Sequence, residues 1–161
     1  MSKFRVNVCL YPPADAYDSD SVAAALTAAM APFDMNLNED FNPDATWDWW
    51  RIDAGEGVRF AVKPEHDGDP RLIYGDPEYE RETLRCDGGP RGLLDFGAPH
   101  RDTIACSALL TLDGEWLGLK PYSNAAGHDS SAARDAYFEQ STAYLEKLDA
   151  DCVVVRLLCH C

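Results

Sequence analysis

Apolar positions along this chain follow two different periods. Some segments alternate apolar and polar residues or are apolar throughout, which is typical of strands. Two others place apolar residues three or four positions apart, behind capping serines and aspartates, which is typical of helices. The predicted strands are 3–10, 47–52, 58–62, 107–112, 115–119 and 152–159. The predicted helices begin at the caps 19–21 and 130–131 and carry the stripes Val22, Leu26, Met30 and Phe33, and Ala133, Tyr137, Ser141, Tyr144 and Leu148.

Turn residues between these segments predict which strands pair. Asp113 and Gly114 form a two-residue hairpin signal between the strands on either side. The five residues 53–57 suit a second hairpin, which would join the tryptophan-containing strand to the strand that follows it. The valine-rich strand at 152–159 is almost continuously apolar, so we expect it at the centre of a sheet.

The order strand, helix, strands, helix, strand predicts an α+β fold. We expect a ferredoxin-like antiparallel sheet with two helices on one face. From 63 to 101 the chain is dense in proline, glycine and aspartate, which indicates a long irregular insertion. Within it we predict a short strand at 72–74 and a helical turn near 93–94. No break in composition divides the chain, so we interpret 1–161 as a single domain.

Net charge narrows the classes of partner. The chain has 161 residues, 46% of them hydrophobic, and a formal net charge of −14. This charge opposes direct binding of nucleic acid, whose phosphates it would repel, and it favours a basic protein partner. An acidic genome-wide composition explains the charge equally well. The sequence shows no membrane-spanning run and no leader, so we expect a cytoplasmic protein without membrane contact.

The cysteines do not follow a metal-binding pattern. Six are present without a Cys-x-x-Cys pair. Cys9, Cys106 and Cys152 lie in apolar segments, where we expect buried, reduced thiols. In a strand at 159–161 the two cysteines face one side and the histidine the other, so we predict a strand end there. We also find no catalytic signature, and we expect no metal and no cofactor. The sequence favours a binding protein and leaves a minor enzyme open as the alternative.

The tryptophans supply the first candidate binding residues. Three of the four fall in the segment Trp47, Asp48, Trp49, Trp50, and Arg51 follows them. In a strand, Trp47 and Trp49 would face one side and Trp50 the other. We predict that two indoles are buried beneath the 63–101 insertion and that Trp49 or Trp50 remains accessible as a recognition anchor.

The second candidate segment contains Arg85, Asp87, Gly88, Gly89 and Arg91. A glycine pair can turn its N–H groups toward an anion, and the flanking arginines would strengthen such a nest. The segment lacks the lysine and the spacing of a phosphate-binding loop. A rigid turn that docks the following apolar residues on the sheet is the simpler interpretation.

These segments together resemble uncharacterised proteins from actinobacteria and their phages. In those proteins the tryptophan segment usually continues Ile-Gly-Gly-Arg-Trp, whereas this chain has Ile-Asp-Ala-Gly-Glu at 52–56. Those proteins also tend to be longer before the tryptophans and after the Cys-Asp-Gly-Gly turn, so this chain resembles a compact version. The segments that carry the resemblance are 48–52, 85–90, 93–96, 110–116, 137–149 and the strand that ends at Cys159-His160.

The resemblance implies an accessory protein that regulates a DNA-processing enzyme by protein–protein contact. A recombination directionality factor for an integrase and an inhibitor of a host-defence enzyme are the two forms it suggests. A second hypothesis is a nucleotide-binding protein or minor enzyme that uses the arginine-flanked glycine turn. A third is a structural component of a virion. The sequence leaves the oligomeric state open.

Overall fold

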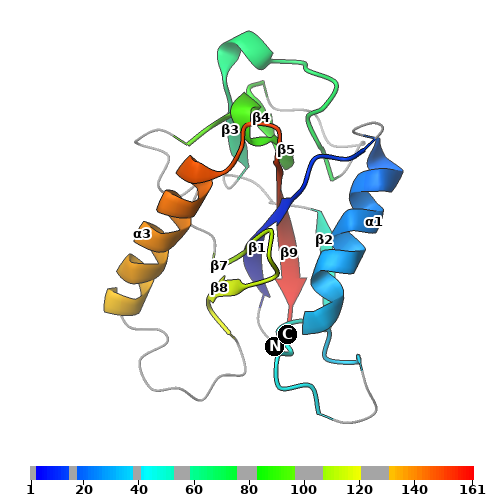
Figure 1. Ribbon diagram of the computed structural model, residues 1–161, viewed down its shortest axis with the longest axis vertical. Coiled ribbons are helices and arrows are strands. Elements are labelled where there is room, and N and C mark those ends of the chain that lie inside the picture. The colour runs from blue at the N-terminus through cyan, green and yellow to red at the C-terminus, as the bar shows by residue number, and fades with distance from the viewer. Residues whose placement is uncertain are drawn as a thin grey trace.

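A mixed β-sheet forms the centre of the molecule, with a helix on either side of it (Figure 1). The computed structural model describes residues 3–14, 18–37, 41–52, 59–75, 83–96, 107–120 and 131–161. In order across the sheet, the strands are β2 (Trp49–Ile52), β9 (Val153–His160), β1 (Lys3–Leu10), β7 (Ala108–Leu110) and β8 (Trp116–Gly118). A sixth strand, β5 (Gly88–Pro90), shares one edge of β9 with β2.

The two long strands β1 and β9 are antiparallel and pair along their whole length. Their register runs from Lys3 opposite His160 to Leu10 opposite Val153. Every residue from Val153 to Cys159 is buried, which confirms the predicted central position of this apolar strand. Both faces of the sheet therefore carry apolar surface that another layer must cover.

The two long helices cover opposite faces of this sheet. Side chains alternate along β9, so Val155 joins the core beneath α1 (Ser19–Met30), and Val154 joins the core beneath α3 (Ser131–Lys147). The prediction of two helices on one face is wrong, because a single layer of helices would leave the other apolar face in water. The helices bury Val22, Leu26 and Met30 in the first core, and Tyr137, Ser141 and Leu145 on the second face.

The sheet is mixed, because β1 and β7 run parallel. The predicted ferredoxin-like antiparallel arrangement is therefore wrong, whereas the α+β class holds. The hairpin of β7 and β8 is antiparallel, as the Asp113-Gly114 signal predicts. Gly114 has a φ of +83°, a left-handed conformation that glycine adopts without a steric penalty.

The second predicted hairpin does not form. β2 pairs with β9, whereas β3 (Phe60–Val62) lies in the middle of a separate three-stranded sheet. The described residues of the 63–101 segment are more regular than expected, since they supply strands to both sheets. Those strands are β5 in the main sheet, and β4 (Arg85–Cys86) and β6 (Leu94–Asp95) on either side of β3.

Short 3-10 helices complete this region. η2 (Pro64–His66) follows β3, and η3 (Arg91–Leu93) confirms the helical turn predicted near 93–94. The strand predicted at 72–74 is reduced to a single bridge between Ile73 and Gly88. A third one-turn helix, η1 (Ala31–Phe33), extends α1.

The cysteines lie mostly in the two cores. Cys9, Cys86, Cys152 and Cys159 are buried free thiols, and Cys161 is partly buried. Cys106 lies outside the described residues. Within the described ranges, neither α1 nor α3 has the length and apolarity of a membrane-spanning helix.

Candidate functional site

The tryptophan segment divides between the core and the surface. The Trp47 indole N–H donates to the backbone oxygen of Met30 at 3.1 Å, and its ring meets that of Trp50 edge to face at 6.5 Å between centroids. Both rings pack against the core on the α1 side. The predicted alternation fails at Trp47 because this residue precedes β2, so the strand period does not apply to it. The hydrogen bond to Met30 places Trp47 against the end of α1, and Ile73 of the 63–101 segment packs on the same core as both indoles.

Trp49 is the accessible indole of the three. It opens β2 and is 43% exposed. The guanidinium carbon of Arg51 lies 5.6 Å from the centroid of its ring, which is within the range of a cation–π contact. Of the two anchors that the sequence left open, Trp49 or Trp50, the structure exposes Trp49.

Basic side chains surround this indole. Residues directly opposite each other in paired strands share a face of the sheet. The register places Lys3, His160 and Trp49 in one row across β1, β9 and β2. Two positions along the strands, on the same face, Arg5 and Arg51 lie on either side of Leu158. The exposed indole therefore lies in a locally basic part of a strongly acidic chain, and the expected aromatic anchor does not coincide with acidic surface.

His160 also has a carboxylate partner. Its Nδ1 atom lies 2.8 Å from Oδ1 of Asp48, which holds the ring in one orientation. In the part of the chain that the structure describes, no three His, Cys, Asp or Glu side chains gather as a metal-binding group. Together with the Asp48 backbone N–H, which donates to the His160 oxygen at 3.0 Å, the pair fixes the end of β9 against the start of β2.

The Cys-Asp-Gly-Gly-Pro segment is built into the sheet. Gly88 and Gly89 lie in β5, are buried, and are in register with Val155 and Val154 of β9. A Cβ atom on Gly88 would lie 2.6 Å from the oxygen of Val154, so only glycine allows this approach. Because both glycines are enclosed, their position favours the docking role over an anion nest.

The charged residues of this segment have structural partners. Asp87 is 1% exposed; its Oδ2 accepts the N–H of Gly75 at 2.7 Å, and its Oδ1 lies 3.4 Å from Nε of Arg59. Arg91 donates from Nε to the backbone oxygen of Leu145 at 2.9 Å and from Nη2 to the backbone oxygen of Glu146 at 3.2 Å. It thereby satisfies carbonyls at the end of α3, where a cation is favoured. Arg85 lies in β4 of the second sheet.

A buried arginine, which sequence reasoning missed, lies next to this segment. Arg156 is 1% exposed in the middle of β9 and donates from Nε to Oδ1 of Asn7 at 2.9 Å. Its guanidinium carbon is 4.1 Å from the centroid of the Phe60 ring, which links the main sheet to the second sheet. Burial raises the pKa of the nearby Cys86 thiol to about 12. The signal in the sequence was an arginine inside an otherwise apolar strand.

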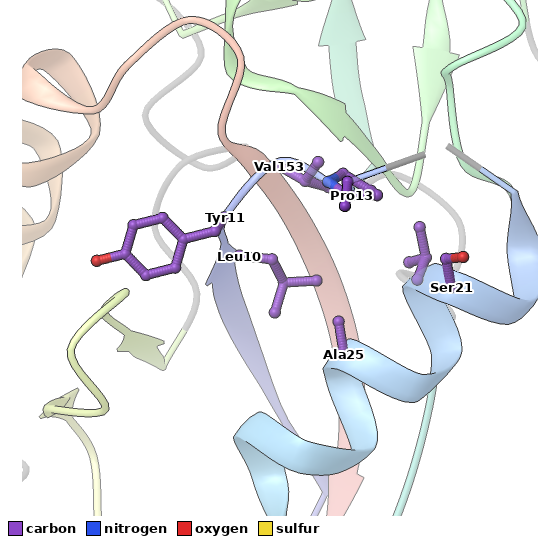
Figure 2. A pocket seen from close by; sticks show the side chains of 8 residues that line it. Leu10, Tyr11, Pro13, Ser21, Ala25 and Val153 are labelled. Atoms are coloured by element: carbon purple, nitrogen blue, oxygen red, sulfur yellow. The ribbon is translucent and has the colours of Figure 1, made fainter. Parts of the chain in front are cut away.

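An apolar groove lies at the opposite end of β1 from Lys3, and sequence reasoning missed it too. It consists of two adjoining cavities of about 280 and 270 Å³, and Leu10, Tyr11 and Ala25 line both of them. Figure 2 shows Leu10 and Ala25 in the space between β1 and α1, with Tyr11 projecting on the side away from Ser21. Tyr11 is 63% exposed. The groove is therefore open to water along the wall that Tyr11 forms.

Comparison of the chain with models of known protein families, with curated proteins and with solved structures gives no match.

Proposed function

We propose that this chain is a binding protein that acts by protein–protein contact on a DNA-processing enzyme. The observation that carries the proposal is Trp49, an indole 43% exposed at the start of a paired strand. Large aromatic side chains that become buried on association dominate the energy of protein interfaces. An indole held on a strand loses little conformational freedom when a partner covers it.

The surroundings of Trp49 support an interface with defined orientation. The Arg51 guanidinium lies against the ring, and His160 opposite it is fixed by Asp48. Such a group combines an apolar centre with a charged rim, which is the usual anatomy of a protein-binding patch. The net charge of −14 favours a partner with basic surface elsewhere in the contact.

The class of partner comes from the resemblance of the chain to actinobacterial and phage proteins. We propose an accessory regulator in the cytoplasm of a host cell, which modulates an integrase or inhibits a host-defence enzyme. We propose that its partner is basic and acts on DNA. We propose also that the chain itself binds no nucleic acid, because its net charge of −14 opposes phosphates despite the basic side chains around Trp49.

Affinity capture with matched variants tests this function. The tagged full chain is compared with Trp49→Ala and with Phe41→Ala, which removes another exposed ring, one that is 84% exposed. We expect a basic DNA-processing protein from an actinobacterial lysate to be retained by the chain and by Phe41→Ala at low salt, and lost with Trp49→Ala. Equal retention by all three proteins, or capture only of proteins without a role in DNA processing, would contradict the proposal. Matching circular dichroism spectra establish that the variants are folded.

A further inference from the structure

The groove at the end of β1 exists because small side chains on α1 face the end of the sheet. Ala25 and Ala29 line it from the helix, and Leu10, Leu110 and Leu112 line it from the strands and the turn after β7. Longer side chains at the two alanine positions would fill the space between helix and sheet. The prolines after Tyr11 end β1, so no further strand residues cover the opening.

The lining of the groove is mainly apolar and carries no positive charge. Among the described residues that line the two cavities, none is a lysine, arginine or histidine. Tyr11 stands in the wall shared by both cavities and leaves 63% of its surface in water. An exposed ring beside an apolar hollow provides contact area that a partner can bury.

Four carboxylates are close in sequence to residues that line the two ends of the groove. Asp18 and Asp20 precede Ser21, which lines the first cavity, and Asp113 and Glu115 stand on either side of Gly114, which lines the second. All four are exposed. The backbone N–H and the hydroxyl of Ser21 donate to Asp18, which lowers the pKa of this carboxyl below its usual value and keeps it ionised.

We infer that this groove binds a basic segment of a protein partner, with aliphatic side chains in the two cavities and lysine or arginine side chains against the carboxylates at either end. The inference rests on the proposed protein-binding function and adds a second contact, separate from Trp49. Two neighbouring hollows suit two apolar anchors of one segment, and the anionic ends complement cations between and beside those anchors. A neutral small molecule would leave the charges at the ends unused.

Peptides of defined composition test the groove in the full-length protein. The probe is a short peptide of leucine and lysine; one control peptide carries glutamate in place of lysine, and another carries serine in place of leucine. We expect only the leucine–lysine peptide to bind and to shift the backbone NMR signals of Leu10 and Ala25. Its affinity should fall as salt is added. Equal binding of the serine–lysine peptide would mean attraction by charge alone, and would overturn the inference.

Two variants separate the cavities from the charges. Ala25→Leu places a larger side chain in both cavities. It should weaken the affinity for the leucine–lysine peptide by about tenfold or more, because a buried aliphatic side chain of the peptide is excluded. Asp113→Asn with Glu115→Gln leaves the cavities intact. This double variant should weaken the affinity for the same peptide by roughly threefold and make that affinity less dependent on salt. The matched control, Glu139→Gln with Glu146→Gln, makes the same charge change on exposed positions of α3 and should bind as the wild type does. If the control weakens binding as much as the pair at the groove, the inference is wrong.

The outcome for the groove is distinguishable from that for the proposed function. If the peptide does not bind while capture of a partner still depends on Trp49, the groove is not a docking site and the protein-binding function stands. If the peptide binds in the groove and no DNA-processing partner depends on Trp49, the groove inference holds and the proposed function fails. Should Ala25→Leu not fold, the serine–lysine peptide tests the cavities in the wild-type protein, and the double variant at the turn tests the charges.

Discussion

Trp47 donates its indole N–H to the backbone oxygen of Met30 at 3.1 Å, which joins the tryptophan segment to the last turn of α1. The same ring packs edge to face on Trp50. Because the one-turn helix η1 continues from Met30, this hydrogen bond ties the tryptophan segment to the junction of α1 and η1. The contact explains why two of three clustered indoles are structural and only Trp49 is exposed.

Replacing Trp47 by phenylalanine should therefore destabilise the fold. Trp47→Phe removes the hydrogen bond to Met30 and leaves a void against Trp50, for an expected loss of about 1–3 kcal/mol in the free energy of unfolding. Trp49→Phe at the exposed position should stay within about 0.5 kcal/mol of the wild type. Urea unfolding followed by circular dichroism measures both. Equal losses for the two variants would show that the division into buried and exposed indoles is wrong.

The buried arginine should not tolerate lysine. Arg156→Lys loses the Nε donor to Asn7 and the planar contact with Phe60. We expect the free energy of unfolding to fall by about 1–3 kcal/mol. Arg134→Lys, the same change at an exposed position of α3, serves as the control and should have little effect. If Arg156→Lys unfolds at the wild-type urea concentration, the guanidinium geometry contributes nothing to stability.

Gly88 should be far less replaceable than Gly68. The Cβ atom of Gly88→Ala would lie 2.6 Å from the oxygen of Val154 and 2.9 Å from the Cα atom of Val155, so β5 must move away from β9. We expect a loss of about 3 kcal/mol or more. Gly68 has a φ of +76° and no atom within 4 Å of such a Cβ, so Gly68→Ala should cost only about 1 kcal/mol of backbone strain. Thermal unfolding of the two variants compares the costs directly. A reversed order would contradict the close approach of the two strands.

Local periodicity predicted the main elements of this fold well. Both helices and the strands β1, β7, β8 and β9 lie where the apolar spacing places them, because each is specified by residues close together in sequence. Pairing was harder to predict. β2 was expected to pair with the next strand along the chain, yet it pairs with β9. This register places Trp50 and Ile52 against the core beneath α1, and such a long-range match is not visible in local spacing.

The candidate site was predicted only in part, because it too depends on contacts between residues far apart in the sequence. An accessible indole in the tryptophan segment could be expected from composition, whereas its identity depended on where β2 begins. The groove depends on Ala25 and on Leu110, which come together only in the folded chain, and on the absence of large side chains. Periodicity describes which face a residue occupies, and it carries no information on a space that no residue fills.

The buried thiols should make the protein less stable in alkaline solution. Burial raises the pKa of Cys9 and of Cys86 to about 12 from an unperturbed 9.0. The unfolded chain therefore releases these protons at a lower pH than the folded one. The stabilising contribution is complete below about pH 9 and is lost as the pH rises toward about 12.

Removing one thiol should reduce that dependence on pH. Across the range from 9 to 12, each buried thiol contributes a slope of up to about 1.4 kcal/mol per pH unit to the free energy of unfolding, because it accounts for up to one proton. Cys9→Ala should decrease the slope by that amount in urea titrations between about pH 9 and pH 10.5. Val8→Ala, which removes core volume at the neighbouring position of β1 and no titratable group, should lower stability and leave the slope unchanged. An unchanged slope in Cys9→Ala would mean that the thiol ionises as easily in the folded chain as in the unfolded one, and that it is not buried between the sheet and α3.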